Sequence, residues 1–220
     1  MIQAQELRRH YRMGGETIRA LDGVSLSIEA GDSVAILGPS GSGKSTLMHL
    51  LGGLERPTSG SISVDGEELA MLEPPELARY RNEKVGFVFQ SFNLQAHLTA
   101  LENVELPLKL GNVPRRERRR LAEARLAEVG LLDRRDHRPS ELSGGQRQRV
   151  SVARALVRAP RFLLADEPTG NLDSKTGAEI LELFLRLNRE QKLTLVIVTH
   201  NPELADRLGR RIVLRDGRLA

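Results

Sequence analysis

The sequence contains no cysteine and no tryptophan, and aromatic residues make up only 3% of its 220 residues. The absence of cysteine excludes disulfide bonds, zinc sites built from thiolates and a cysteine nucleophile. The core must therefore consist mainly of Leu, Val, Ile and Ala, which is common in α/β proteins with buried parallel strands. A stacking surface for single-stranded nucleic acid needs aromatic side chains, so we expect no nucleic-acid partner.

Long apolar segments are also lacking. The longest apolar runs have the length of strands and fall far below the roughly 20 residues that a membrane-spanning helix needs. The first six residues, Met-Ile-Gln-Ala-Gln-Glu, do not show the basic and then apolar pattern of a signal peptide. With 40% hydrophobic and 28% charged residues, the chain is expected to be a soluble cytoplasmic protein with one well-cored domain.

The net charge is +4, and the basic excess gathers in two runs at residues 115–120 and 134–138. Such runs can meet phosphate groups or anionic lipid. The simpler interpretation is a solvated helix start after Pro114, because charge runs predict partners weakly. From the sequence alone we assign no role to the run from Arg115 to Arg120.

Half-buried antiparallel strands are predicted near the N-terminus. Residues 17–21 and 24–28 alternate apolar and polar side chains, with turn signals at Asp22-Gly23 and Gly31-Asp32. Residues 61–66 repeat the alternation. These segments predict a small antiparallel sheet.

Short continuous apolar runs predict a second, parallel sheet that is buried on both faces. They lie at residues 34–37, 85–89, 162–165 and 195–198. Residues 91–142 carry no strand signal but show Leu and Ala at helical spacing. We expect a single domain over residues 1–220, with a core and β-subdomain in 1–90 and 143–220 and a helical subdomain in 91–142.

A phosphate-binding loop follows the first buried run. Residues Gly38 to Ser45 match G-x-x-x-x-G-K-[ST] between a predicted strand and a predicted helix. Glycines let backbone N–H groups wrap a phosphate, Lys44 reaches the β and γ oxygens, and Ser45 can hold Mg²⁺. The loop predicts a purine nucleotide with Mg²⁺ but does not separate ATPases, kinases and GTPases.

Two adjacent carboxylates, Asp166 and Glu167, end a later buried strand. Ligands of parallel sheets lie at the carboxyl ends of strands. Asp166 is predicted to complete the Mg²⁺ shell and Glu167 to act as general base on the attacking water. This pair favours hydrolysis over transfer to a second substrate, and no Asn-Lys-x-Asp segment for reading guanine is present.

A second anion-binding helix start is predicted at Leu142-Ser143-Gly144-Gly145-Gln146, with Ser143 as N-cap. Together with the phosphate loop and the strand that ends in Asp166-Glu167, this segment closely resembles the signature of ATP-binding cassette (ABC) ATPases. The resemblance covers nearly the whole chain. The motifs keep the family's order, with Gln90 after the phosphate loop, then the signature, the acidic pair, Asn171-Leu172-Asp173 and His200.

The resemblance implies an α/β fold with a P-loop NTPase (RecA-like) core, an antiparallel N-terminal β-subdomain and an inserted helical subdomain. It also implies a head-to-tail homodimer in the ATP-bound state, in which the phosphate loop of one chain and the signature of the other enclose one ATP. His200 would contact the γ-phosphate, Gln90 would reach the metal or the water, and Tyr11 would stack on adenine. The implied catalytic residues are Glu167, His200 and Gln90, and the implied metal ligands are Ser45, Gln90 and Asp166. The implied ATP-binding residues are Tyr11, Gly38, Pro39, Ser40, Gly41, Ser42, Gly43, Lys44, Ser45, Thr46, Ser143, Gly144, Gly145, Gln146 and Asp173.

Three further segments resemble the macrolide-efflux, lipoprotein-release and cell-division branch of the family, at residues 88–94, 99–104 and 165–173. Membership implies an ATPase subunit on the cytoplasmic face of the inner membrane, with an integral membrane permease subunit docked on the helical subdomain. This ATPase subunit would drive export, the extraction of lipoproteins or the transmission of force across the membrane. The alternative is an ATPase that regulates a cell-envelope or cell-division partner without a transported substrate, and the sequence does not separate the two.

Overall fold

Two sheets and seven α-helices make up the chain, in a computed structural model that describes residues 1–220 except for the side chain of Met13. The first sheet is antiparallel, with strand order β2-β1-β4-β5. The second has the order β10-β9-β3-β8-β7-β6, and in it β9, β3, β8, β7 and β6 run parallel. The strands are β1 (Ile2–Met13), β2 (Glu16–Ile28), β3 (Ser33–Leu37), β4 (Ser59–Val64), β5 (Glu67–Glu68), β6 (Val85–Phe89), β7 (Phe162–Asp166), β8 (Thr194–Val198), β9 (Arg210–Arg215) and β10 (Arg218–Leu219).

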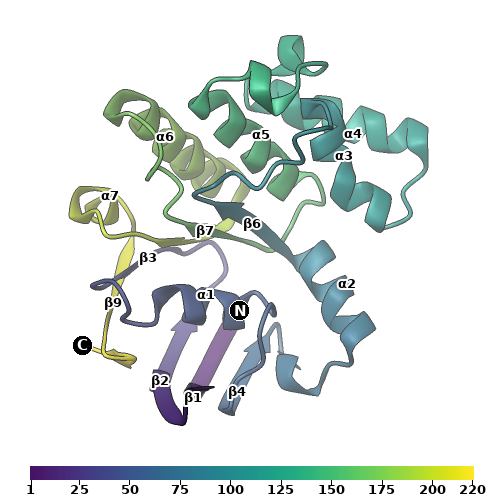
Figure 1. Cartoon of the computed structure of the whole chain (residues 1–220). Helices are drawn as coiled ribbons and strands as arrows, with labels where there is room; N and C mark the ends of the chain where they lie inside the picture. The colour runs from purple at the N-terminus through teal and green to yellow at the C-terminus, as the bar shows by residue number, and fades with distance from the viewer.

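The helices cover the two faces of the parallel sheet (Figure 1). Helix α1 packs between the two sheets, while α3, α4 and α5 form a group above the parallel sheet in the view of Figure 1. The helices are α1 (Lys44–Leu51), α2 (Pro74–Lys84), α3 (Ala100–Leu110), α4 (Arg115–Glu128), α5 (Gly144–Leu156), α6 (Ser174–Gln191) and α7 (Pro202–Asp206). None of these helices combines the length and apolar character that crossing a bilayer requires.

Burial on both faces explains why the parallel strands read as continuous apolar runs. Alternate residues of β8 face opposite sides: Val196 and Val198 pack toward α1 and the antiparallel sheet. Leu195 and Ile197 pack toward the core that contains α3 to α6. The parallel sheet therefore separates two hydrophobic cores and contributes side chains to both of them. The strands predicted at 34–37, 85–89, 162–165 and 195–198 are confirmed as β3, β6, β7 and β8.

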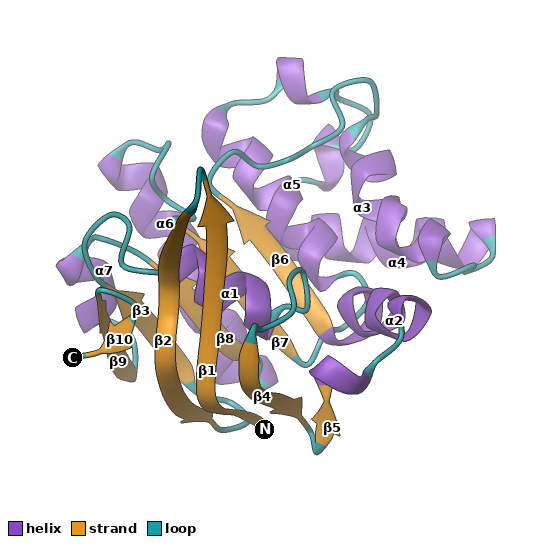
Figure 2. Cartoon of the chain, turned by 60° about the horizontal axis from the view of Figure 1, so that its bottom comes forward, coloured by secondary structure: helices purple, strands orange, loops and turns teal.

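The antiparallel sheet is confirmed, but the predicted break at Asp22-Gly23 is wrong. Strand β2 runs through these residues without a turn and pairs with β1 along its length (Figure 2). Gly23 has φ +84°, and the register of β1 against β2 shifts near Leu7, so the two residues form an irregularity inside the ladder. Side chains of Arg8 and Arg218 lie within ion-pair distance of Asp22. A β-bulge favours the same residue types as a turn, which is why Asp22-Gly23 was predicted as a break between two strands.

The segment between β6 and β7 contains helices and no strand among its described residues, as its spacing predicts. Helix α3 begins with a capping box, in which Thr99 accepts from the backbone N–H of Glu102 and the Glu102 side chain accepts from that of Thr99. Asn103 is buried, and its amide bonds the backbone of the preceding loop. These contacts anchor the loop that joins β6 to the helical segment.

Candidate functional site

The loop from Gly38 to Gly43 joins β3 to α1 and curls around the ammonium group of Lys44. The Lys44 Nζ donates to the carbonyl oxygens of Gly38 and Pro39, at 2.9 and 2.8 Å. Gly41 and Gly43 have φ of +79° and +100°, in the left-handed region that favours glycine. The loop thus needs its glycines for its shape, and it concentrates positive charge at the N-terminus of α1.

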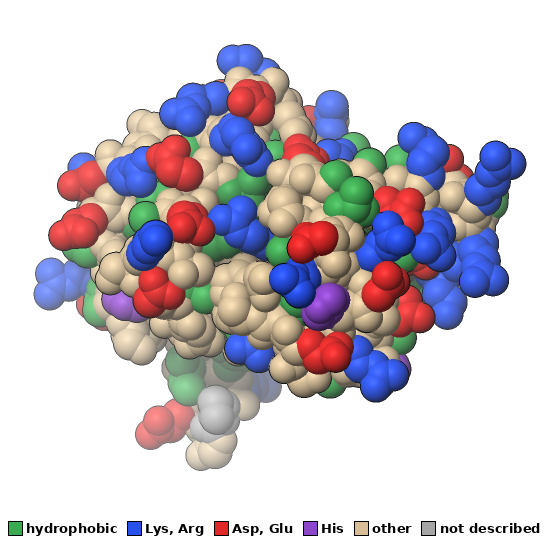
Figure 3. Space-filling model, turned by 90° about the horizontal axis from the view of Figure 1, so that it is seen from above, with side chains coloured by type: hydrophobic (Ala, Val, Ile, Leu, Met, Phe, Trp, Pro, Cys, Tyr) green, Lys and Arg blue, Asp and Glu red, His purple; other side chains and the backbone are tan. Residues whose placement is uncertain are grey.

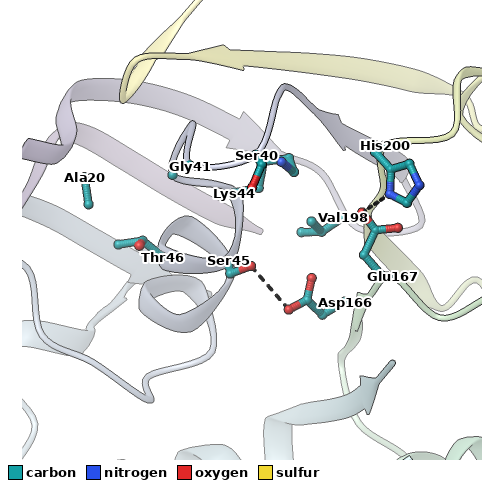
Figure 4. A pocket seen from close by; sticks show the side chains of 11 residues that line it. Ala20, Ser40, Gly41, Lys44, Ser45, Thr46, Asp166, Glu167, Val198 and His200 are labelled. Atoms are coloured by element: carbon teal, nitrogen blue, oxygen red, sulfur yellow. Dashed lines mark hydrogen bonds and ion pairs between the residues drawn. The ribbon is translucent and has the colours of Figure 1, made fainter. Parts of the chain in front are cut away.

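The carboxyl end of β7 faces this loop across a cavity (Figure 4). The parallel register pairs Asp166 with Val198 of β8, so the residues that follow both strands lie side by side. His200 Nδ1 lies 2.7 Å from Glu167 Oε1, and Thr199 Oγ1 lies 3.5 Å from Glu167 Oε2. Glu167 is 18% exposed and has φ +44°. The fold therefore holds this carboxylate at the cavity in a backbone conformation that non-glycine residues rarely adopt.

The cavity between these two strand ends has a volume of about 390 Å³, and we call it the phosphate-loop cavity. Most of its wall consists of residues that the sequence singles out, drawn from three separate segments. Of the predicted site residues, it is lined by Ser40, Gly41, Gly43, Lys44, Ser45, Thr46, Asp166, Glu167 and His200. Ala20 and Val198, which the sequence did not single out, complete the lining.

Asp166 lies beside the first turn of α1. Its Oδ2 accepts a hydrogen bond from Ser45 Oγ at 3.3 Å (Figure 4). Burial raises the pKa of the Asp166 carboxyl above its ordinary value, and the nearby charge of Glu167 raises it further, against the lowering effect of the Ser45 hydrogen bond. A cation between Ser45 and Asp166 would offset the cost of keeping two carboxylates ionised so close together.

The remaining predicted residues lie outside this cavity. Gln90 Nε2 donates to Asn171 Oδ1 at 3.3 Å, and Asn171 Nδ2 donates to the Gln90 carbonyl at 3.0 Å. Ser143 is the N-cap of α5, and its side chain and that of Gln146 form a capping box. Asp173 is the N-cap of α6 and accepts from the Thr176 N–H at 3.0 Å. None of these four predicted residues, Gln90, Ser143, Gln146 and Asp173, lines the phosphate-loop cavity.

Tyr11 belongs to a polar cluster that the sequence did not reveal. Its hydroxyl donates to Glu55 Oε2 at 2.6 Å, and the Arg9 guanidinium lies 4.6 Å from the centre of the Tyr11 ring. Arg9 Nε also donates to Glu55 at 3.0 Å, and His49 Nδ1 lies 3.2 Å from its other oxygen. Burial alone would raise the pKa of Glu55, but the hydrogen bonds from Tyr11 and His49 and the charge of Arg9 lower it. Glu55 stands in a loop after α1, and no motif marks it.

A second, larger hollow lies between α2, α3, α5 and β6, with a volume of about 970 Å³. We call it the lateral groove. Phe87 and Phe89 lie in its wall with their rings stacked at 5.8 Å. Four arginines and one glutamate also line it, namely Arg79, Arg81, Arg154, Arg158 and Glu83. The groove is thus apolar with a basic margin.

Comparison with known proteins agrees with the cavity geometry. The model of the family described as ABC transporter matches residues 21–170 of this chain. The chain belongs to the ABC transporter family. It is 56% identical to an uncharacterized ABC transporter ATP-binding protein of Thermotoga maritima, covering 100% of this chain and 93% of that protein. It is 49% identical to the lipoprotein-releasing system ATP-binding protein LolD of Syntrophus aciditrophicus, covering 100% and 98%.

A solved structure gives the same result for the fold of this ABC cassette. The dimeric structure of a post-hydrolysis state of the ATP-binding cassette MJ0796, bound to ADP and Pi, superposes with a TM-score of 0.92 at 46% identity. The match covers 100% of this chain and 96% of that chain. The predicted α/β cassette fold is confirmed, and the chain is an ATP-binding subunit of the ABC ATPase type.

Proposed function

We propose that the phosphate-loop cavity binds ATP and that Glu167 is the general base for its hydrolysis. The observation that carries the proposal is the placement of Glu167 opposite the phosphate loop, hydrogen-bonded to His200 at 2.7 Å. A carboxylate that accepts a proton from water must be held still and partly out of bulk solvent. The strand ends of β7 and β8 supply both conditions.

Lys44 and the backbone N–H groups of the loop would bind the β- and γ-phosphates. The ammonium group already donates to the loop carbonyls, so a phosphate would replace these neutral acceptors with anionic oxygens, which bind the ammonium more strongly. Thr46, two residues after Lys44 on α1, lines the cavity and would meet the α-phosphate. We assign the adenine to the Tyr11 ring, on the face opposite Arg9, because Arg9 and Glu55 fix the orientation of that ring.

The residues present fit Mg²⁺ bound with the nucleotide. Ser45 Oγ and Asp166 Oδ2 are hard oxygen ligands 3.3 Å apart, and burial makes an ionised Asp166 costly without a cation. No cluster of three or more His, Asp or Glu side chains suited to a metal occurs in the part of the chain that is described. This agrees with an ion that takes one or two protein ligands and completes its shell with phosphate and water. When bound, Mg²⁺ would neutralise charge that develops on the phosphate oxygens.

His200 would act through Glu167 and on the phosphate. A carboxylate can only accept, so the His200–Glu167 hydrogen bond places the proton on Nδ1. That leaves Nε2 for the γ-phosphate, whose anionic oxygens can only accept, so the ring would have to carry a proton on Nε2 as well and bind as the imidazolium. Because His200 is 74% exposed, its ring can reorient when a nucleotide enters. Gln90 lies after β6 and contacts the loop at Asn171, so a change at the cavity can be passed to the helical segment through this pair.

We propose that a second copy of the chain completes the site. The signature segment at Ser143 presents the N-terminus of α5, which attracts anions, yet it does not line the phosphate-loop cavity of its own chain. Asp173 is the N-cap of α6. The two residues before it, Asn171 and Leu172, lie next to Gly144 of the signature segment. Both features fit a head-to-tail homodimer in which the signature of one chain closes on the ATP of the other. The dimeric state named for the related MJ0796 cassette supports this arrangement.

We further propose that the lateral groove receives a cytoplasmic segment of an integral membrane subunit, so that the protein acts at the cytoplasmic face of the membrane. The stacked Phe87 and Phe89 would take the apolar face of a short amphipathic helix. The arginine margin favours a segment with acidic side chains. The similarity to LolD supports a role in lipoprotein release or a related export process.

Light scattering of the Glu167→Gln variant tests the site. The variant should bind ATP without hydrolysing it and should form a dimer only when ATP is present. A double variant that also carries Lys44→Ala is the control, because it should bind no ATP and stay monomeric. Hydrolysis by Glu167→Gln at the wild-type rate would refute the assignment of the base.

Pull-down of the chain with its membrane subunit tests the groove. Ala78→Asp places a negative charge among the arginines of α2 and should weaken the complex, while basal hydrolysis stays unchanged. Ala127→Asp, on an exposed position of α4 outside the groove, is the matched control. Equal loss of binding by both variants would count against docking at this groove.

A further inference from the structure

The positive charge of the protein is concentrated at one corner. Residues 109–120, which join α3 to α4, contain six of the 33 basic residues and one of the 29 acidic residues. We call this segment the basic corner. Its net charge is +5, so the rest of the chain, with 27 basic and 28 acidic residues, has a net charge of −1. Figure 3 shows basic side chains gathered at the right-hand edge, over the start of α4.

Part of this charge is free of internal partners. Arg118 pairs with Glu105 at 3.2 Å, Arg119 with Glu123 at 3.1 Å and Arg120 with Glu117 at 2.5 Å. The other three basic residues, Lys109, Arg115 and Arg116, are exposed and form no ion pair with any described residue.

The needs of the helix do not explain these arginines. Arg115 and Arg116 occupy the first turn of α4, where the helix dipole disfavours positive charge and favours acidic side chains. An external anion would turn this unfavourable placement into a favourable one. The corner also exposes a large apolar side chain, since Leu110 is 77% exposed at the end of α3. Cations around an exposed apolar side chain are the composition of surfaces that bind anionic bilayers.

The corner is continuous with the lateral groove. Leu110, Gly111 and Asn112 line the end of the groove and also belong to the basic corner. A membrane subunit whose cytoplasmic segment fills the groove therefore brings the corner toward the bilayer surface. This orientation rests on the docking proposed above. The charge and the exposure of the basic corner are independent of that docking.

We propose that the basic corner binds the anionic phospholipid headgroups of the membrane, with Leu110 entering the headgroup layer. Lys109, Arg115 and Arg116 bind lipid phosphates, whereas Glu105, Glu123 and Glu117 offset the charge of the three paired arginines. A basic side chain near such a surface contributes about 1 kcal/mol, which corresponds to about fivefold in affinity. The contact would orient the cassette beneath its membrane subunit and strengthen a weak groove interaction by keeping the two partners close.

Co-sedimentation of the full chain with phospholipid vesicles tests the proposal. The chain should bind vesicles that contain phosphatidylglycerol more tightly than vesicles of pure phosphatidylcholine, and added salt should weaken the binding. The double variant Arg115→Gln/Arg116→Gln should bind the anionic vesicles roughly 25-fold more weakly, from two losses of about fivefold. Leu110→Ser should also weaken binding but leave its salt dependence unchanged. Basal ATP hydrolysis, which reports on folding, should be unchanged in Arg115→Gln/Arg116→Gln, because neither arginine lines the phosphate-loop cavity or the lateral groove. An unchanged circular dichroism spectrum checks the folding of Leu110→Ser.

The matched control is Arg210→Gln/Arg211→Gln, which removes the same charge from β9, on the opposite side of the molecule from α4 (Figure 1). Equal weakening by the two double variants would overturn the proposal, because it would show attraction by net charge alone. Binding of a short DNA duplex at Arg115 and Arg116 without binding of anionic vesicles would also overturn it. The measurement needs no membrane subunit. Hydrolysis by Glu167→Gln at the wild-type rate, or the lack of an ATP-dependent dimer of that variant, would therefore refute the proposed function and leave this result standing.

Discussion

Gly43→Ala should destabilise the protein far more than Gly41→Ala, although both glycines lie in the phosphate loop with positive φ. A Cβ on Gly43 would lie 2.3 Å from the carbonyl oxygen of Ala20 and 2.9 Å from Leu21 Cδ2. The first of these atoms is backbone of β2 and cannot move aside by rotating a side chain. A Cβ on Gly41 meets no atom within 4 Å.

The magnitudes follow from the two terms. A left-handed φ costs a residue with a Cβ roughly 1–2 kcal/mol, and both variants incur this cost. Forcing an extra carbon into a packed site adds about 1–3 kcal/mol at Gly43 only. We therefore expect a loss of roughly 2–5 kcal/mol for Gly43→Ala and roughly 1–2 kcal/mol for Gly41→Ala. The larger loss is a substantial part of the 5–15 kcal/mol that is typical of a folded domain.

Equilibrium unfolding in urea, without nucleotide, measures both losses. With a slope of about 2 kcal/mol per molar, the midpoint should fall by roughly 1–2.5 M for Gly43→Ala and by roughly 0.5–1 M for Gly41→Ala. The slope itself should not change. Equal midpoints for the two variants would refute the argument, because they would show that β2 yields to the new methyl group at no cost.

Substitutions at three further residues test the site and the cluster around Tyr11. Ser143→Arg should leave ATP binding by the monomer intact and abolish hydrolysis. Ser143→Asn is the control, because asparagine keeps an N-cap and this variant should hydrolyse ATP. Equal rates of hydrolysis for the two variants would contradict a shared site. His200→Ala should lower kcat roughly 100-fold without preventing ATP-dependent dimerisation in gel filtration, and an unchanged kcat would remove His200 from the mechanism. Glu55→Gln should reduce the free energy of unfolding by roughly 1–2 kcal/mol at pH 7. Since the folded state lowers the pKa of Glu55, its stabilisation is present above the ordinary value of 4.5 and is lost as the pH falls through the lowered value, so the variant should approach the wild type in acid unfolding curves.

Local patterns were sufficient for the central strands and the phosphate loop. A strand buried on both faces disfavours polar side chains that lack a partner, and residues 195–198 are accordingly all apolar. This continuous apolar run is what allowed β8 to be predicted from the sequence. The helix start predicted at Ser143 is likewise local, since a cap satisfies backbone groups within four residues. The cap at Thr99 was not predicted, although its capping box is equally local. The C-terminal strands β9 and β10 were not predicted, because Arg210–Arg215 mixes exposed arginines with only two buried side chains.

Asp22 and Gly23 show the limit of local reasoning. The same two residues can close a hairpin or bulge inside a continuous strand, and the choice depends on the partner strand. Here β1, with 12 residues, is nearly as long as β2, with 13, and pairs with it on both sides of Gly23. Continuing the ladder therefore satisfies more backbone groups than a turn would.

The sequence by itself determined the residue types of the site, because phosphate binding and water activation each demand particular groups at short spacing, as in the run Gly38 to Ser45 and the pair Asp166-Glu167. Only the tertiary structure decided which of those residues meet. The parallel register of β7 and β8 brings His200 to Glu167, while Tyr11 lies against Glu55, 44 residues away, and the signature at Ser143 stays outside its own chain's cavity. Contacts of this kind depend on strand order and loop closure, which are set by the packing of the whole core and leave no mark on a short stretch of sequence.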